Sequence, residues 1–271
     1  MKRCHAKTLR SFLDETGLHA KKGLSQNFLI DENIVRNIIK TAQVSEKDVV
    51  IEIGPGPGAL TEALLDTGAQ IIAIEKDKGF AQALKKIQHS RLTVIEEDIL
   101  DSDIKALAQG KKVKIVSNLP YHLTSPILGM LLPLQEHIET LTIMVQKEVA
   151  ERLCAKPGSS DYSSFTLFVS AYTNIKYCFT VQPTCFYPKP KIRSAVIQLT
   201  PTAPLPFPPH FFARVRAAFA KKRKMIKVSL KEWYPSDTIE QALRKLDLSP
   251  LARPETLDVH KWIPLISSLE N

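Results

Sequence analysis

The stretch VVIEIGPGPGALTEALLDTG, residues 49–68, joins an apolar run to a helical pattern through a glycine-rich turn. Residues 49–53 predict a buried strand, and residues 59–68 have the spacing of an amphipathic helix. Three glycines in the turn leave room for a ligand against the backbone where the helix begins: Gly54, Gly56 and Gly58. The turn is a weak indication by itself, because many α/β proteins need one merely to reverse the chain. Its G-x-G-x-G spacing differs from the G-x-G-x-x-G of dinucleotide sites and argues mildly against NAD.

Four more apolar runs repeat the strand pattern, with helix-compatible segments such as residues 79–88 between them. They are QIIAIE (70–75), LTVIEED (92–98), VKIVSN (113–118) and LTIMVQ (141–146). Strands that alternate with helices imply right-handed crossovers and a mainly parallel, doubly wound α/β sheet. These runs are almost continuously apolar, which predicts helices on both faces of the sheet.

The later part of the chain predicts an edge of the sheet and then a second domain. YCFTV (177–181) and SAVIQL (194–199) are expected to form an antiparallel pair that closes one edge. The segment TPTAPLPFPP (200–209) holds five prolines in ten residues and favours a domain boundary. Beyond it, residues 211–233 and 238–246 predict two helices.

The composition predicts a folded protein of the cytoplasm. With 271 residues, 44% of them apolar, the chain can bury one large α/β core and a smaller one. No apolar run approaches the roughly 20 residues that span a bilayer, and the basic N-terminal segment lacks the apolar stretch of a secretory signal. The four cysteines have no C-x-x-C spacing, so we expect reduced thiols and neither a disulfide nor a metal site. They are Cys4, Cys154, Cys178 and Cys185.

The net charge of +9 is concentrated at the two ends of the chain. Residues 1–25 hold six lysines and arginines against two acidic residues, and residues 201–271 hold twelve against seven. Residues 26–200 hold nineteen of each kind and are neutral. A charge needed only for solubility would be spread more evenly, so we favour a polyanionic partner bound by the two ends. The alternative is a solvated basic surface.

Polar side chains stand at consecutive strand ends, where a doubly wound sheet binds its ligand. Glu75, 21 residues after Gly54, can accept hydrogen bonds from both hydroxyls of a ribose, or it is only a solvated charge. Asp98 can accept from the exocyclic amine of adenine, with the two preceding glutamates as alternatives, and Asn118 closes the next strand. A glycine turn, two acids and an amide describe a site for an adenosine with a short non-phosphate tail, which favours S-adenosylmethionine.

The turn NLPY, residues 118–121, places an amide, a proline and an aromatic ring directly after a strand. Methyl transfer from a sulfonium mainly requires alignment and exclusion of water, and acceptors on an adenine amine stabilise the charge that develops on its nitrogen. Asn118 offers a side-chain carbonyl, and Pro120 holds Leu119 extended so that main-chain carbonyls face one way. Tyr121 can stack on a flipped base. The alternative is an ordinary Asn-Pro turn with a half-buried tyrosine.

The segment CFYPKPKIRSAV, residues 185–196, offers a second aromatic ring and a group of basic residues. Phe186 is a candidate to cover the other face of the base, or it is a core residue, as most phenylalanines are. The basic side chains suit phosphate contacts: Lys189, Lys191 and Arg193.

Motifs along residues 21–257 together resemble the KsgA (RsmA) family of ribosomal RNA adenine dimethyltransferases. They are KKGLSQNFLID (21–31), EIGPGPGALT (52–61), IEKD (74–77), EED (96–98), NLPY (118–121), VQKEVAERL (145–153), FYPKPKIRSAV (186–196), AAFAKKRKMIKVSL (217–230) and LARPETL (251–257). The resemblance implies a Rossmann-like class I methyltransferase fold that uses S-adenosylmethionine and no metal. It implies a catalytic domain with a basic N-terminal extension in residues 1–200, and a small helical RNA-binding domain in residues 201–271.

The same resemblance implies that two methyl groups are added to N6 of each of two adjacent adenosines near the 3′ end of 16S, small-subunit ribosomal RNA. The substrate is then an immature ribosomal subunit, and we expect a monomer. It also implies a donor site that includes two residues of the SQNFL segment: Asn27 and Leu29, with Gly54, Gly56, Glu75, Asp98 and Asn118. Ser25 stands where the family usually has glycine, and we expect a local adjustment without loss of activity.

A basic run lies on the predicted helix 211–233, and its spacing predicts that Lys224, Lys227 and Lys231 share one face. A solvated face is the alternative, but beside a nucleobase-modifying site we favour phosphate contacts for the run. Its residues are Lys221, Lys222, Arg223, Lys224 and Lys227.

Other functions remain open at this point. One is an Erm-type dimethyltransferase of large-subunit ribosomal RNA, although the two C-terminal motifs favour the small-subunit branch. Another is a non-catalytic small-subunit assembly factor that keeps the donor site. A methyltransferase for protein or small-molecule amines does not explain why the excess charge is confined to the two ends.

Overall fold

The computed structural model describes residues 3–21, 23, 26–221 and 223–270. The chain forms two compact units, one of Met1–Ala150 with Asn174–Thr202 and one of Glu151–Thr173 with Ala203–Asn271. The predicted domain division is wrong for residues 151–173, which were expected in the first domain. Buried side chains of this segment, among them Leu167, pack in the core of the second unit.

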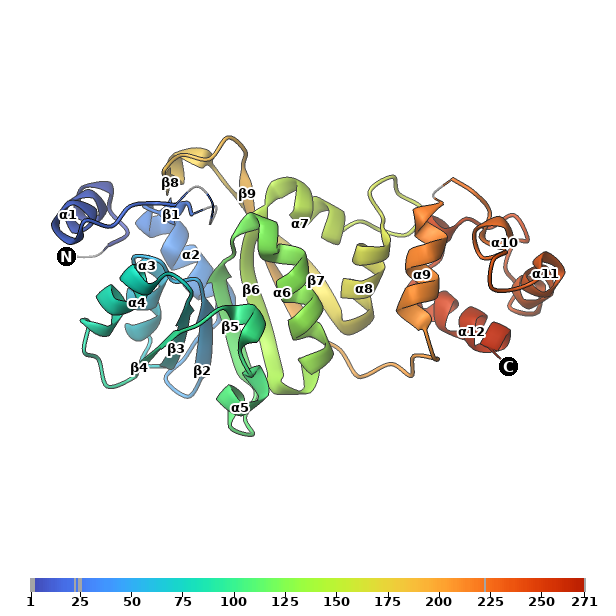
Figure 1. Ribbon diagram of the computed structural model, residues 1–271, viewed down its shortest axis with the longest axis horizontal. Helices are drawn as coiled ribbons and strands as arrows, with labels where there is room; N and C mark the ends of the chain where they lie inside the picture. The colour runs from blue at the N-terminus through green and yellow to red at the C-terminus, as the bar shows by residue number, and fades with distance from the viewer. Residues whose placement is uncertain (1–2, 22, 24–25, 222, 271) are drawn as a thin grey trace. The chain divides into compact units, whose positions relative to one another are not determined.

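The first unit is built mainly from alternating strands and helices (Figure 1). Its strands are β1 (Phe28–Leu29), β2 (Val49–Ile53), β3 (Gln70–Glu75), β4 (Leu92–Glu96), β5 (Val113–Asn118), β6 (Ile138–Gln146), β8 (Phe186–Tyr187) and β9 (Ser194–Pro201). Its α-helices are α1 (Ala6–Thr16), α2 (Glu32–Ala42), α3 (Ala59–Leu65), α4 (Lys78–Lys85), α5 (Ile104–Ala108) and α6 (Thr124–Leu131). Short 3-10 helices are η2 (Ile99–Asp101), η3 (Tyr121–Leu123), η4 (Leu132–His137) and η5 (Pro183–Cys185). Two of the three boundaries between the units fall within α7 (Lys147–Leu153) and β7 (Thr173–Val181), and the third follows β9.

The predicted doubly wound sheet is confirmed, with seven strands in the order β4-β3-β2-β5-β6-β9-β7. Neighbours from β4 to β6 are parallel, and β9 is antiparallel to β6. The two later runs lie at one edge of the sheet, as predicted, with β9 between β6 and β7. The predicted helices 59–68 and 79–88 correspond to α3 and α4, which both end earlier than predicted.

The core of the first unit explains why its strands are continuously apolar. Val50 and Ile51, successive residues of β2 that point to opposite faces, are both 0% exposed. On one face, buried residues of α2 and α3 cluster with Val50 and with Val116 of β5. Burial of both residues means that each face of the sheet is covered.

The strand order reverses at β2, whose neighbours are β3 and β5. At such a point the turns that follow the two central strands diverge, which leaves space outside their carboxyl ends. The turns concerned are the glycine-rich turn after β2 and the NLPY turn that begins at the last residue of β5. The fold therefore brings together two motifs about 60 residues apart in the chain.

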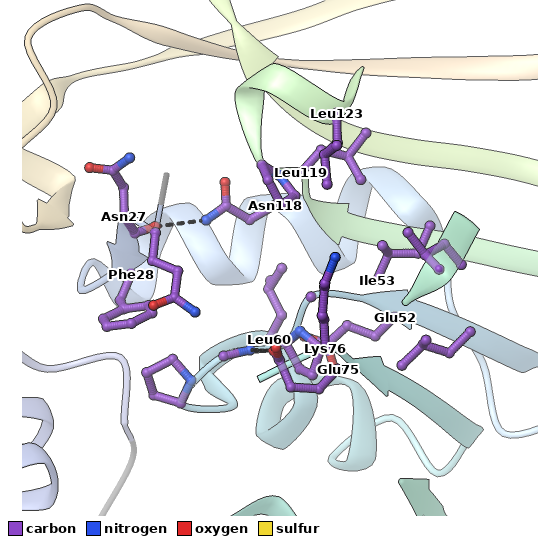
Figure 2. A pocket seen from close by; sticks show the side chains of 18 of the residues that line it. Asn27, Phe28, Glu52, Ile53, Leu60, Glu75, Lys76, Asn118, Leu119 and Leu123 are labelled. Atoms are coloured by element: carbon purple, nitrogen blue, oxygen red, sulfur yellow. Dashed lines mark hydrogen bonds between the residues drawn. The ribbon is translucent and has the colours of Figure 1, made fainter. Parts of the chain in front are cut away.

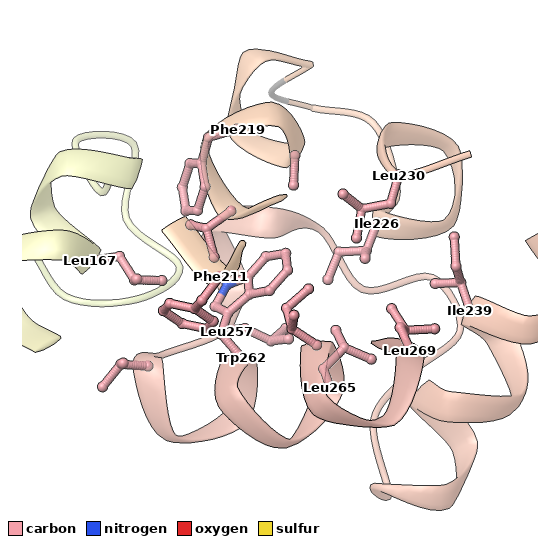
Figure 3. Packing of buried hydrophobic residues seen from close by; sticks show 14 of the residues in the cluster. Leu167, Phe211, Phe219, Ile226, Leu230, Ile239, Leu257, Trp262, Leu265 and Leu269 are labelled. Carbon is pink, nitrogen blue, oxygen red and sulfur yellow. The ribbon is translucent and has the colours of Figure 1, made fainter. Parts of the chain in front are cut away.

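The second unit is a set of helices around one apolar core (Figure 3). Its elements are α8 (Ser164–Tyr172), α9 (Phe211–Ala220), α10 (Ile226–Ser229), α11 (Ser236–Lys245), η6 (Pro254–Thr256) and α12 (Val259–Glu270). The core contains Trp262, which is 0% exposed and lies 6.4 Å from Phe219 between ring centroids. Helix α11 confirms the predicted helix over residues 238–246.

The predicted continuous helix over residues 211–233 is wrong beyond Ala220, where α9 ends. Arg223 has a φ of +77°, which a continuing α-helix does not contain. The chain then turns so that the N–H of Ile226 donates to the carbonyl of Ala252 at 2.9 Å. The break lets side chains on both sides of it enter the same core.

The break also separates the basic residues of this run. The prediction that Lys224, Lys227 and Lys231 share one helical face is wrong, because only Lys227 lies within α10. Lys224 precedes that four-residue helix and Lys231 follows it.

Candidate active site

A cavity lies at the carboxyl ends of β2, β3, β4 and β5 (Figure 2). Ten residues singled out from the sequence line it: Asn27, Leu29, Gly54, Gly56, Glu75, Asp98, Asn118, Leu119, Pro120 and Tyr121. They come from five separate stretches of the chain, and the switch in strand order explains why these meet.

The glycine-rich turn forms the wall of the cavity beyond β2. Gly54 and Gly56 have φ angles of +63° and +54°, a region that L side chains rarely adopt. A Cβ atom at Gly56 would lie 3.2 Å from Cε1 of Phe28, so a side chain there would press on β1. The N–H of Gly56 donates to Oε2 of Glu75 at 2.9 Å, which holds the turn against the end of β3.

Glu75 ends β3 and is only 5% exposed. Its other oxygen, Oε1, accepts the N–H of Asp77 at 2.7 Å. Burial raises the pKa of Glu75 and the nearby Asp77 charge adds to the rise, although the N–H donors oppose it. Each carboxylate oxygen can accept more than one hydrogen bond, so Glu75 keeps acceptor capacity for a ligand.

Glu52, in the middle of β2, also lines the cavity and escaped the sequence analysis. It is 1% exposed, and its Oε2 accepts the hydroxyl of Thr61 at 2.6 Å. Burial, with a contribution from the Glu75 charge, raises the pKa of Glu52 to about 8. The carboxyl is therefore protonated at neutral pH. An acidic residue inside the otherwise apolar strand VVIEI was the sequence signal that could have indicated Glu52.

Asp98 follows β4, which ends two residues earlier than predicted, and caps the short helix η2. Its Oδ1 accepts the N–H of Leu100 at 3.0 Å, and its Oδ2 forms an ion pair with Nζ of Lys76 at 2.6 Å. The Lys76 ammonium, together with that N–H, holds the pKa of Asp98 below its usual value. Of the two preceding glutamates, Glu97 also lines the cavity.

Asn118, the last residue of β5, is held by the segment that carries Asn27 (Figure 2). Its Nδ2 donates to the main-chain carbonyl of Asn27 at 2.9 Å. A carbonyl oxygen can only accept, so the amide nitrogen must face Asn27 and Oδ1 must lie on the other branch. The contact fixes the side chain with its acceptor oxygen directed away from Asn27.

The turn that follows β5 is anchored at both ends. Leu119 is 2% exposed and donates its N–H to the carbonyl of Met144 at 3.1 Å, and Pro120 has φ −58° and ψ 124°. The hydroxyl of the half-buried Tyr121 hydrogen-bonds with Oγ of Ser194 at 2.7 Å. Burial raises the pKa of Tyr121. The ring therefore has a fixed place in the cavity wall.

Phe186, the second candidate for base stacking, is buried in the core of the first unit. It lies in β8, where it pairs with Leu29 of β1, and it is 2% exposed. Its cluster contains Leu29 and Val35 of α2. The prediction that Phe186 covers a base is wrong for this structure, and the alternative of a core residue is what is observed. Pairing of β1 with β8 is the cause, because it turns the ring inward.

The predicted RNA-contacting residues differ in how accessible their charges are. Lys189, Lys191 and Arg193 are exposed on the segment between β8 and β9. In the second unit, Arg223 and Lys224 are exposed as well.

Two further basic residues of the second unit have acidic partners within it. Lys221 forms an ion pair with Glu232 at 2.6 Å, and Lys227 forms one with Glu240 at 2.8 Å. Lys222, and Ser25 in the first unit, lie outside the described residues.

Two residues near the N-terminus, Arg3 and Leu9, line the cavity without having been predicted. The prediction for this segment rested on its basic charge alone. Leu9 and Leu13 are four residues apart and both buried, which is the spacing of a packed helical face and the signal that was overlooked.

Nowhere in residues 3–21, 23, 26–221 and 223–270 are three or more His, Cys, Asp or Glu side chains placed to hold a metal ion. In the same ranges no helix has both the length and the apolar character to cross a membrane. In the part of the chain that the structure describes, none of the four cysteines is joined in a disulfide.

The family profile described as "Ribosomal RNA adenine dimethylase" matches residues 17–270. The chain belongs to this family. Relatives named "Ribosomal RNA small subunit methyltransferase A" include one from Protochlamydia amoebophila, 44% identical over 273 residues that span 96% of this chain and 95% of that protein. Another, from Chlamydia muridarum, is 42% identical over 282 residues and covers 100% of both chains.

Solved structures of similar proteins support the same fold for this ribosomal RNA adenine dimethylase. A dimethyladenosine transferase from Plasmodium falciparum has a TM-score of 0.78 at 26% identity, covering 90% of this chain and 97% of that one. The 23S rRNA methyltransferase ErmE has a TM-score of 0.68 at 26% identity, covering 90% and 100%. The predicted class I methyltransferase fold is confirmed.

Proposed function

We propose that the chain dimethylates N6 of two adjacent adenosines near the 3′ end of 16S, small-subunit ribosomal RNA, with S-adenosylmethionine as methyl donor. The observation that carries the proposal is the hydrogen bond between Asn118 and Asn27, because it orients an amide acceptor at the wall of the cavity beside the glycine-rich turn. The names of the relatives at 44% and 42% identity support the small-subunit RNA as substrate. The lower TM-score of ErmE gives less support to a large-subunit substrate.

The cavity fits S-adenosylmethionine. Gly54 and Gly56 expose bare backbone, and a Cβ at Gly56 would press on Phe28 of β1. The buried Glu75 suits the two ribose hydroxyls, and the ionised Asp98 suits the adenine amine of the donor. Asn27 and Leu29 complete the proposed donor site. When bound, this donor supplies an electrophilic methyl group on a sulfonium, so the protein need not activate it.

The protein's own task is then to make the target amine nucleophilic and to align it. Oδ1 of Asn118 accepts one N–H of the amine and stabilises the positive charge that develops on nitrogen. The carbonyl of Pro120 already accepts the N–H of Leu123 at 2.9 Å. We therefore assign the second acceptor to the carbonyl of Leu119. The methylated ammonium loses its proton readily, so no acid or base of matched pKa is required.

Tyr121 provides the surface for the flipped base. Its hydroxyl is tied to Ser194, so the ring loses little freedom when a base stacks on it. Stacking on an aromatic side chain contributes roughly 1–3 kcal/mol per base. Once methylated, the amine keeps one N–H for the second transfer, so one of the two acceptors is used again.

We further propose that each unit contributes phosphate contacts. In the first unit these are Lys189, Lys191 and Arg193, and in the second Arg223 and Lys224, all of them exposed. The substrate is an immature small subunit, the protein acts as a monomer, and both meet in the cytoplasm.

The test is incubation of the protein with radiolabelled S-adenosylmethionine and small subunits that lack these methyl groups, followed by nucleoside analysis. We expect label in dimethyladenosine. Asn118→Ala should lower the rate by about 10²–10³-fold, the usual effect of removing one group that stabilises charge in a transition state. The matched control is Asn174→Ala, the same change at an exposed position, which should keep full activity.

Three outcomes would contradict the proposal. Label in large-subunit RNA alone would favour the Erm-type function. Binding of subunits and donor without any label would leave a non-catalytic assembly factor. Full activity of Asn118→Ala would show that the amine acceptor has been misplaced.

A further inference from the structure

The N-terminal segment before Gly17 lies outside the family profile, which begins at residue 17. It nevertheless contributes two residues, Arg3 and Leu9, to the cavity wall. Leu9 belongs to α1 and is 1% exposed. An element that is additional to the matched family core thus borders the proposed donor site.

Arg3 ties this segment to the glycine-rich turn. Its NH1 group donates to the carbonyl of Pro57 at 2.7 Å, and its main-chain N–H donates to Oε2 of Glu62 at 2.9 Å. Its Nε also lies 3.3 Å from Oε1 of Glu62. The guanidinium stands 4.6 Å from the ring centroid of Phe12 on α1. Arg3 therefore connects the turn, α3 and α1.

The apolar face of α1 packs on the other side of the cavity wall. Leu9 and Leu13 form a buried cluster with Phe28 of β1 and Phe80 of α4. The rings of Phe28 and Phe80 meet edge-to-face with centroids 5.2 Å apart. Phe28 is also the side chain on which a Cβ at Gly56 would press. Docking of α1 and the shape of the glycine-rich turn therefore depend on the same ring.

The chain after α1 is fastened to the turn between β3 and α4. Leu18 packs closely on Gly79, and a Cβ atom added at Gly79 would lie too close to Cδ2 of Leu18. Lys21 forms an ion pair at 2.7 Å with Asp77, whose side chain is 1% exposed. That carboxylate is therefore well shielded from solvent, and the pair is screened less than a surface one.

From these contacts we infer that residues 3–21 form an outer wall of the donor-binding site, and that α1 must undock before the donor can exchange. This inference rests on the proposed function, in which the donor occupies the cavity. Leu9 is a positioning residue that acts through Phe28, and Arg3 is a positioning residue that acts through the glycine-rich turn. Binding equilibria are reciprocal, so a donor held by α1 must in turn hold α1 in place.

The first experiment measures binding of S-adenosylmethionine and its demethylated product by calorimetry, with dissociation rates from stopped-flow chase. Leu9→Ala and Arg3→Ala should each weaken binding about tenfold through faster dissociation, as expected for loss of one well-packed contact. Leu9→Met keeps an apolar wall and should retain near-normal affinity. The matched control on the exposed side of α1 is Lys7→Ala, which should bind as the unmodified chain does.

The second experiment measures amide hydrogen exchange of α1 in the unmodified chain, with and without the demethylated product. Exchange over residues 9–16 should slow when this ligand is bound, whereas exchange in α11 of the second unit should not change. This readout needs no catalysis and does not depend on whether a variant folds.

The outcomes separate the two proposals. No binding heat with the unmodified chain would overturn the proposed function itself. Normal binding by the unmodified chain, with unchanged affinity in both alanine variants, would overturn this inference alone. Unchanged exchange in α1 at saturating ligand would overturn it as well.

Discussion

Replacement of Glu52 by glutamine should stabilise the protein, and the gain should grow with pH. Glu52 is 1% exposed, and burial raises its pKa from the ordinary 4.5 to about 8. Between these pH values the unfolded chain gives up the proton of Glu52 whereas the native protein keeps it. The free energy of unfolding therefore falls as pH rises through this window. Glu52→Gln removes that loss because an amide does not titrate there.

The magnitude follows from the width of the window. A separation from 4.5 to about 8, at about 1.36 kcal/mol per unit, gives a total of about 5 kcal/mol above pH 8. From pH 5.5 to 7.5 the advantage of the variant should grow by about 3 kcal/mol, and below pH 4.5 it should vanish. Thr61 keeps an acceptor in the variant, since the glutamine carbonyl replaces Oε2.

The assay is urea unfolding followed by far-ultraviolet circular dichroism at half-unit steps between pH 5 and 8.5. Fluorescence of the second unit, which holds both tryptophans, follows the other core in the same samples. Glu46→Gln makes the same change at an exposed site of the first unit and is the matched control. A difference between Glu52→Gln and the unmodified chain that stays constant from pH 5.5 to 7.5 would refute the reasoning.

Four other substitutions test the donor site, the basic run and the second core. Gly56→Ala should weaken donor binding at least tenfold by calorimetry, because its φ of +54° and the nearby Phe28 both oppose a Cβ; unchanged affinity would contradict the role of the turn. Lys224→Glu should lower RNA affinity in filter binding and reduce the salt slope, whereas Lys227→Glu, at a residue that already has an acidic partner, should do so less; equal losses would mean that the ion pair does not matter. Trp262→Ala should cost about 3–5 kcal/mol in urea unfolding of the second unit, the usual range for a fully buried ring; a loss below about 1 kcal/mol would exclude Trp262 as a core anchor.

The doubly wound sheet and most of the site could be predicted because the signals are local. The strands are short, almost continuously apolar runs that any short window reveals, and polar residues at their ends converge because parallel strands finish at one edge. Gly54, Glu75 and Asn118 were found in this way, and each lines the cavity. The N-terminal wall was missed because residues 1–25 were examined for charge alone and not for helical spacing.

The failures share a different cause, which is that long-range contacts overrode a local pattern. The helical pattern of residues 211–233 is broken because Ile226 bonds to Ala252 and both flanking segments share one core. Residues 151–173 belong to the second unit, and not to the first as predicted, for the same reason. Phe186 carries an aromatic ring of the kind that can stack on a base, but pairing of β8 with β1 buries it.

The sequence by itself determined the order of strands and helices, the residue types at the strand ends and the family, because these depend on spacing along one chain. Only the tertiary structure decided which branch of the Asn118 amide faces Asn27, and that Glu52 holds its proton at neutral pH. Both depend on the groups that distant segments of the chain place around a side chain. Hydrogen-bond geometry and desolvation are properties of that surrounding, and no linear pattern records them.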